Sequence, residues 1–279
     1  MRALKGLLRD RLAATCLIFI TLLLIGGAFA PWLAAYDPLY VDVSRKLEAP
    51  GAEHWLGTDH LGRDILSRLL HGARITLGFS ILIMLITATF GSALGIMAGY
   101  MKGRVDRVVT RVCDVMISFP SEVLILALVG MLGPSLGNVV LACVIAKFPW
   151  YARMVRTVTG KYAGMNFVLY ARVAGFGAPY IIRRHILPSA AGEIAVLATL
   201  DSGSIILLIS ALSFLGLGAQ PPAPEWGSML SEARNIMTLY PWQMLPPGLA
   251  ILTLAAAFNF LGDSLRDALD PRHNSGGAP

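Results

Sequence analysis

The sequence predicts an all-α membrane protein with about six transmembrane helices. Of its 279 residues, 56% are hydrophobic and only 14% carry a charged side chain, whereas a soluble domain carries about 25% charged residues. The mean hydropathy is +0.65. The apolar residues gather in runs close to the roughly 20 residues that one spanning helix needs. A chain of this length therefore has room for about six spans and the loops between them.

The first span follows a basic N-terminus and ends near Ala28-Phe29-Ala30, a sequence that resembles a signal-peptide cleavage site. Its apolar run from Leu12 to Leu33 is longer than a signal-peptide core, so we expect a retained helix. The second span contains Gly91, Gly95 and Gly99, and this spacing lets helix backbones approach closely; a hinge for transport is the alternative. We place the six spans at about 12–34, 75–100, 115–133, 136–156, 192–218 and 246–264.

The distribution of Lys and Arg predicts the orientation of the chain in the membrane. If the N-terminus is inside, most of the basic residues fall in cytoplasmic segments, as the positive-inside rule expects. Both termini are then cytoplasmic, and we expect a multi-pass protein of the cytoplasmic (inner) membrane of a prokaryote.

Two long segments are then placed outside. The first, about 35–74, contains Thr58 and Asp59, either of which could cap a helix. An apolar face follows them, with charged side chains elsewhere, and predicts a short helix on the outer membrane surface. We therefore divide the chain into residues 1–74, an N-terminal helix with this loop, and residues 75–279, the core.

The second segment is rich in proline, and its aromatic residues suit the water–lipid boundary. The residues concerned are Leu61, Ile65, Leu66 and Leu69 on the apolar face, Arg63, Asp64 and Arg68 off it, and Trp226, Tyr240 and Trp242 in the second segment.

The sequence lacks the usual motifs of catalysis. It contains no GxxxxGK[ST] phosphate loop, no HExxH zinc motif and no GxSxG nucleophile elbow. A pI near 9.4 could indicate nucleic-acid binding, but the charges lie at span ends, so we expect no nucleic acid. His54 and His60 share one loop and could meet a metal, although a surface or capping role is favoured. We expect no catalytic residue and no cofactor bound by this chain.

Asp201 is the best candidate for a functional charge inside a span. An ionisable group at that depth is costly in lipid and usually faces a cavity or a partner. Helical spacing places Ser204 near it. The pair is either a polar patch on a substrate path or a buried interhelical hydrogen bond, and composition does not separate the two. We expect Lys147 to extend to the inner boundary, beside Trp150 and Tyr151.

The segment NFVLYARVAGFGAPYIIRRHILPS, residues 166–189, interrupts this apolar chain with a basic and irregular loop. Its spacing predicts a short helix over about 167–175, with Phe167, Tyr170, Ala171 and Ala174 on one face. Gly175 and Gly177 then break the helix, and a second one follows over about 178–187. Such a pair suits insertion into a groove on a partner protein, but it could equally rest on the anionic inner leaflet.

This segment resembles the EAA loop in permease subunits of ATP-binding-cassette importers, whose pattern is roughly EAAxxxG, nine residues, then IxLP. Ala171 matches the second alanine, Gly175 the glycine and Leu187-Pro188 the ending. The sequence departs from the pattern at Leu169, Tyr170 and His185, which stand at the glutamate, first-alanine and isoleucine positions. The resemblance implies that a loop over about 157–190 docks on an ATPase subunit through a coupling helix. The docking residues would be Phe167, Leu169, Tyr170, Ala171, Arg172, Gly175, Phe176, Gly177 and Pro188.

The resemblance extends over nearly the whole chain. LGTDHLGRDILSRLLHGARITL, SFLGLGAQPPAPEWGSML and FNFLGDSLRDALDPR resemble the second permease of dipeptide, oligopeptide and nickel importers. This implies the type I permease fold of binding-protein-dependent importers. It also implies four kinds of partner: a second permease in a heterodimer, two cytoplasmic ATPase subunits that bind ATP, an extracytoplasmic substrate-binding protein, and membrane lipid.

The cargo is less well defined. FVLYARVAG and LATLDSGSIILL are more similar to nickel-type permeases than to peptide permeases, so we favour nickel, in a chelate, over di- or oligopeptides. An acid on the path also suits a cationic cargo. A secondary transporter that uses Asp201 as its ion site, and a scaffold or sensor without flux, are the competing classes.

Overall fold

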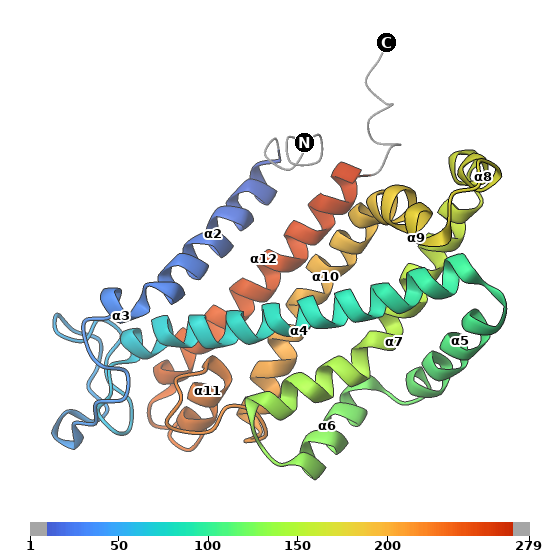
Figure 1. The fold of residues 1–279 in the computed structure, drawn as a ribbon. Coiled ribbons are helices and arrows are strands. Elements are labelled where there is room, and N and C mark those ends of the chain that lie inside the picture. The colour runs from blue at the N-terminus through green and yellow to red at the C-terminus, as the bar shows by residue number, and fades with distance from the viewer. Residues whose placement is uncertain (1–9, 270–279) are drawn as a thin grey trace.

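The computed structural model describes residues 10–269, and every regular element among them is a helix. Five stretches are long and apolar enough to cross a membrane, and a bent helix pair allows a sixth. Figure 1 shows the axes of α2, α10 and α12 similarly inclined, with the long helix α4 crossing α10 and α12. The six-span expectation is thereby confirmed in number when the bent pair counts as one span. The five are α2 (Arg11–Ala28), α4 (Ile65–Met101), α7 (Leu136–Ala163), α10 (Leu187–Phe214) with the turns before it, and α12 (Leu245–Leu269) with the turn before it.

The third predicted span, 115–133, is broken into two helices. α5 (Gly103–Ile117) and α6 (Ser121–Leu132) meet at an angle of 82°. Pro120 at this break has no backbone N–H and disfavours helical backbone in the residue before it. Twelve residues of α6 extend only about 18 Å, which is less than the hydrocarbon thickness of about 30 Å.

Helix α4 is longer than the sequence indicated. Its 37 residues extend about 55 Å, so one end projects well beyond a 30 Å hydrocarbon core. The N-cap is Asp64, whose carboxylate accepts from Ser67 N at 2.7 Å; the expected caps Thr58 and Asp59 are wrong. The short interfacial helix is not a separate element, because its residues after 64 are the first turns of α4, and the boundary at 74/75 lies inside this helix.

Three glycines hold α4 close to α7. A Cβ built on Gly91, Gly95 or Gly99 would come within 2.5–2.7 Å of Tyr151 Cβ, Ala152 O or Arg156 O respectively. No other residue type fits such an approach without moving a helix. The close-packing interpretation of this glycine series is confirmed, and the α4–α7 contact is the most extensive in the fold.

The two ends of the molecule are built differently (Figure 1). One end carries the loop after α2, with α3 (Ala30–Leu33) and η1 (Val43–Arg45), together with α11 (Trp226–Arg234) and η3 (Pro241–Met244). Trp226 is 1% exposed there and its indole N–H donates to Leu69 O at 2.9 Å. Its expected place at the water–lipid boundary is therefore wrong. The opposite end carries α8 (Asn166–Val173), α9 (Ala178–Ile181) and the π-helical turn η2 (Ile182–Ile186).

Candidate functional site

The 166–189 loop folds as a short helix, a tight glycine turn and a second helix that continues into α10. The first helix, α8, ends at Val173, two residues earlier than predicted. Gly175 then adopts φ +84°, a left-handed conformation that glycine adopts without steric cost. Phe176 N–H donates to Ala171 O at 3.1 Å and Gly175 N–H donates to Arg172 O at 3.0 Å. This pair of bonds is a Schellman motif, so the predicted glycine break is confirmed at Gly175.

The face that α8 buries differs from the predicted one. Val168 is fully buried and Ala171 is 7% exposed, and both join an apolar cluster with Ile96 and Val155 of the long helices. Phe167 and Tyr170, which were expected on the same face as Ala171, are exposed. The short side chain of Ala171 thus serves to seat α8 on the bundle, because a larger residue would hold the helix away from the cluster.

Arg172 fixes the orientation of α8. Its guanidinium Cζ lies 4.6 Å from the centre of the Tyr100 ring, and its Nε donates to the Tyr100 hydroxyl at 3.3 Å. A cation over an aromatic face is attracted by about 0.5–2 kcal/mol. The last turn of α4 therefore holds the last turn of α8.

An apolar surface remains uncovered on this loop. Val173 and Tyr180 belong to it, although the sequence did not indicate them; Val173 is 87% exposed, and the ring of Tyr180 stacks on that of Phe176 with 4.4 Å between the ring centres. The feature of the sequence that could have identified both residues is their apolar character in an otherwise basic loop. Gly177 and Pro188 are exposed too, with Pro188 in the first turn of α10. The exposed large apolar side chains of residues 166–189 are Phe167, Leu169, Tyr170, Val173, Phe176, Tyr180 and Leu187.

Asp201 lies near the middle of α10 and is bound by α7. Lys147 donates to Asp201 Oδ1, the Tyr151 hydroxyl donates to Asp201 Oδ2 at 3.2 Å, and Ser204 Oγ donates to Oδ1 at 2.7 Å. Lys147 is therefore not extended to the inner boundary as expected, since its ammonium and the carboxylate neutralise one another. Ser204 lies where the helical spacing predicted it.

This ion pair lines a cavity of about 420 Å³ at the α5–α6 break. Trp150 and Phe119 form apolar walls, and Glu122 in the first turn of α6 adds a second carboxylate. Lys147 and Asp201 are only 16% and 10% exposed, so their charges are largely shielded from bulk solvent. A cavity with one cation and two carboxylates can hold a small solute through both signs of charge.

A buried ion cluster stabilises the end of the molecule that carries the loop after α2 and α11. Arg63 and Arg68, 2% and 1% exposed, both bind Asp59 and Glu232 of α11, with Arg63 Nη2 at 2.6 Å and Arg68 Nη1 at 2.8 Å from Glu232 Oε2. Burial acts to raise the pKa of Asp59, but the charges of Arg68 and Arg63 outweigh it and lower that pKa. The sequence placed both arginines off the apolar face, whereas they join the loop after α2 to α11.

The two loop histidines do not form a pair. His54 Nδ1 lies 2.9 Å from Asp64 Oδ1, while His60 approaches Asp59 and Glu232 in an arrangement with metal-ligand spacing. Both carboxylates of that group are already bound by the two arginines, whose positive charge opposes a metal ion. The group is thus better explained as part of the ion cluster.

The chain has clear relatives among known proteins. Residues 91–275 match the family model described as the binding-protein-dependent transport system inner membrane component, and residues 1–50 match the N-terminal TM domain of oligopeptide transport permease C. The dipeptide transport system permease protein of Alkalihalophilus pseudofirmus is 42% identical over 98% of this chain and 90% of its own. The glutathione transport system permease protein of Pectobacterium atrosepticum is 44% identical, with 97% and 90% covered. The nickel transport system permease protein of Escherichia coli K12 is 42% identical, with 91% and 92% covered.

A solved structure shares the fold. The chain resembles a subunit of the MetNI methionine ABC transporter in an inward-facing conformation, with a TM-score of 0.60 over 74% of this chain and 98% of that one. The sequence identity is 17%, so this likeness concerns the fold alone, which is the type I permease fold.

Proposed function

This chain belongs to the binding-protein-dependent permeases of the dipeptide, oligopeptide and nickel importers, and from that membership we propose what its loop, its cavity and its partners do. As an ABC importer permease subunit it is a multi-pass membrane protein. In our proposal it spans the cytoplasmic membrane of a prokaryote with both termini inside. It pairs with a second permease, two cytoplasmic ATPase subunits and an extracytoplasmic binding protein, and ATP is bound and hydrolysed only on the ATPase subunits.

The proposal depends chiefly on the exposed apolar surface of α8. Tyr170 is 73% and Val173 87% exposed, yet α8 is held firmly by its buried side, by Arg172 and by the Gly175 turn. A helix that only rested on lipid would not need to be fixed in this way at the far end of α4 and α7 (Figure 1). A rigid apolar surface suits a groove on an ATPase subunit, in the manner of helix-in-groove recognition.

The chain also offers a mechanical link from this surface to the cavity. Helical backbone continues from Ala178 through η2 to the end of α10 at Phe214, and Asp201 lies on that helix. When the ATPase dimer closes on ATP, the two coupling helices move together, and α10 transmits the motion to the Lys147–Asp201 pair. The bundle then opens outward to accept cargo.

For the cargo we propose a small solute that carries carboxylates, with chelated nickel and a short peptide as the two candidates. The nickel candidate is supported by the sequence resemblance of the loop and of span five. The peptide candidate is supported by the charges of the cavity, because Lys147 neutralises Asp201 and removes the argument that a lone acid favours a cation. Relatives of nearly equal identity are named for nickel, dipeptide and glutathione transport.

Substitution of Gly175 tests the docking role. Proline at this position fixes φ near −65° and has no N–H, so Gly175→Pro removes both the +84° backbone and the bond to Arg172 O. We expect an assembled transporter in which ATP hydrolysis no longer drives uptake. Gly164→Ala is the control, because Gly164 has a negative φ of −91° and a Cβ there would lie no closer than 3.8 Å to another atom. Normal uptake by an assembled Gly175→Pro transporter would disprove docking through this turn.

Uptake into proteoliposomes separates the two cargoes. Transporter reconstituted with its binding protein and ATP is supplied either with labelled nickel, free or chelated, or with a labelled dipeptide. Uptake of chelated nickel alone supports the first candidate, and uptake of the dipeptide alone supports the second. Flux without ATPase subunits would contradict the importer mechanism and favour an ion-coupled transporter.

A further inference from the structure

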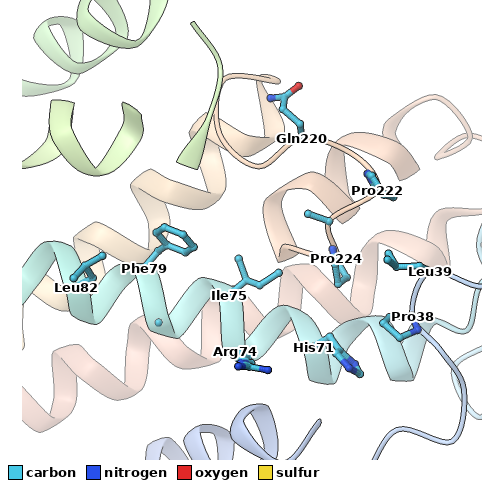
Figure 2. A pocket seen from close by; sticks show the side chains of 12 residues that line it. Pro38, Leu39, His71, Arg74, Ile75, Phe79, Leu82, Gln220, Pro222 and Pro224 are labelled. Atoms are coloured by element: carbon cyan, nitrogen blue, oxygen red, sulfur yellow. The ribbon is translucent and has the colours of Figure 1, made fainter. Parts of the chain in front are cut away.

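A groove of about 630 Å³ lies beside the first half of α4, which is the outer half in the orientation proposed above, and shares no residue with the cavity at the α5–α6 break. Figure 2 shows α4 as its floor, with the proline-rich segment after α10 above one part of it and Pro38 and Leu39 near its end. The size falls within the range of about 300–1,000 Å³ that ligand sites occupy. The groove is therefore large enough to bind a ligand.

One end of the groove is basic. Arg74 and His71 lie on adjacent turns of α4 (Figure 2). Arg74 is exposed, and its guanidinium makes no ion pair or hydrogen bond with residues 10–269. The His71 ring is hydrogen-bonded through Nδ1 to Ser67 O, at a distance of 2.9 Å. This end therefore offers an uncompensated positive charge with free donors.

The rest of the groove is apolar and follows the helix into the membrane. Ile75, Phe79 and Leu82 continue the same face of α4 from Arg74. Eight residues from Arg74 to Leu82 extend about 12 Å, close to half of a hydrocarbon core of about 30 Å. The groove thus has the length of one leaflet, with its charge at the headgroup level.

The walls leave space for a chain rather than for a polar ligand. Pro222 and Pro224 carry no backbone N–H, so that side offers few donors. On the floor, a Cβ built on Gly78 would meet no atom within 4 Å. The glycine therefore keeps the middle of the groove open without being required by helix packing, in contrast to Gly91, Gly95 and Gly99.

We propose that this groove binds an anionic phospholipid, with its phosphate on the Arg74 guanidinium and one acyl chain along Ile75, Gly78, Phe79 and Leu82. The charge and the apolar face occur in the order and at the distance that a phospholipid presents them. Guanidinium groups favour phosphate through paired, charge-assisted hydrogen bonds. The bound lipid stabilises the first turns of α4, next to the buried ion cluster of Asp59, Arg63, Arg68 and Glu232.

Native mass spectrometry of the full-length protein, with the subunits that co-purify, tests the site. The protein is prepared in phosphatidylcholine and titrated with phosphatidylglycerol. We expect one tightly retained phosphatidylglycerol, and roughly tenfold weaker retention in Arg74→Gln, since a lost charge-assisted bond exceeds the 1.4 kcal/mol that corresponds to a factor of ten. Gly78→Leu fills the floor of the groove and should weaken the binding of any phospholipid, whatever its headgroup.

Two control variants keep the result specific. Arg104→Gln removes an exposed arginine at the start of α5, and Gly130→Leu adds the same bulk at an exposed glycine of α6 with open surroundings. Both should retain phosphatidylglycerol as the unsubstituted chain does. The proposal would be overturned if Arg74→Gln and Gly78→Leu both retained phosphatidylglycerol as tightly as the unsubstituted chain does. It would also be overturned if Gly78→Leu lost a co-purifying subunit, because the groove would then be a protein interface.

Discussion

Lys147 and Asp201 meet near the middle of two apolar helices, where an unpaired charge is costly. The carboxylate also accepts from Tyr151 and Ser204, so both of its oxygens are satisfied. The sequence predicted Asp201 and Ser204 together because they lie on one helix. Lys147 was missed as a partner because it lies 54 residues away, although its opposite charge in a neighbouring span was the available signal.

Breaking this pair on one side should destabilise the protein. Lys147→Met leaves the Asp201 charge unpaired, at a cost on the order of 3 kcal/mol in the free energy of unfolding. Lys147→Met combined with Asp201→Asn removes both charges and should recover most of that loss. Thermal unfolding of the purified variants in detergent measures both. Losses that simply add in the double variant would show that the two charges do not interact.

Glu225 should make stability depend on pH. Burial raises the pKa of this carboxyl above its ordinary value of 4.5, although it accepts from Thr76 and from Ser228 N. The folded state therefore holds the proton more tightly than the unfolded state does. Its stabilising contribution is complete below about 4.5 and is lost as pH rises through the raised pKa.

The Glu225→Gln variant tests this assignment. Glutamine keeps an oxygen for Thr76 but does not titrate. We expect the unfolding temperature of the unsubstituted chain to fall relative to that of Glu225→Gln as the pH rises from acidic to neutral. Parallel pH profiles for the two proteins would contradict the assignment.

Helices α4 and α7 form the framework on which both candidate sites depend. α7 carries Lys147, while the ends of α4 and α7 seat α8. Their close approach follows from small residues at four-residue spacing, which are visible in the sequence. A matched pair of substitutions on α4 tests it directly.

Gly95→Ala should loosen this framework. Its Cβ would lie 2.6 Å from Ala152 O, so the helices must separate, at a typical cost of 1–3 kcal/mol for overpacking. Gly78→Ala, on the same helix but facing open space, should be neutral or stabilising by up to about 1 kcal/mol. Thermal unfolding of both variants decides the point. A Gly95→Ala protein as stable as Gly78→Ala would contradict close packing at this glycine.

Helix existence was more predictable than helix ends. Apolar runs located the five long spans, and Gly175 located the loop break, because local chemistry determines both. The extension of α4 to Ile65 was not predicted, since Arg63 and Arg68 look like surface residues until their partners Asp59 and Glu232 are known. The break at Pro120 was missed because the apolar character of 115–133 continues across it. The buried side of α8 also depended on tertiary contacts that spacing alone does not show.

At the scale of the whole molecule, the two ends should face opposite compartments. All three cysteines, Cys16, Cys113 and Cys143, are buried, so an added cysteine reports its own position. A membrane-impermeant maleimide should label Val43→Cys, which is 61% exposed in the loop after α2, in intact cells. Tyr170→Cys, in permease produced without the ATPase subunits that would cover this position, should be labelled only after the membrane is opened. Labelling of Tyr170→Cys in intact cells would reverse the proposed orientation.

Helix α8, in our proposal, is the contact through which an ATPase subunit drives this permease. Tyr170→Cys carrying a short photo-cross-linker, in transporter assembled with its ATPase subunits, tests this contact, with Val43→Cys as the control at the other end. We expect a cross-link from position 170, and none from position 43, to the subunit identified by its phosphate-loop peptide. An assembled, transport-competent complex in which position 170 cross-links only to lipid would contradict it.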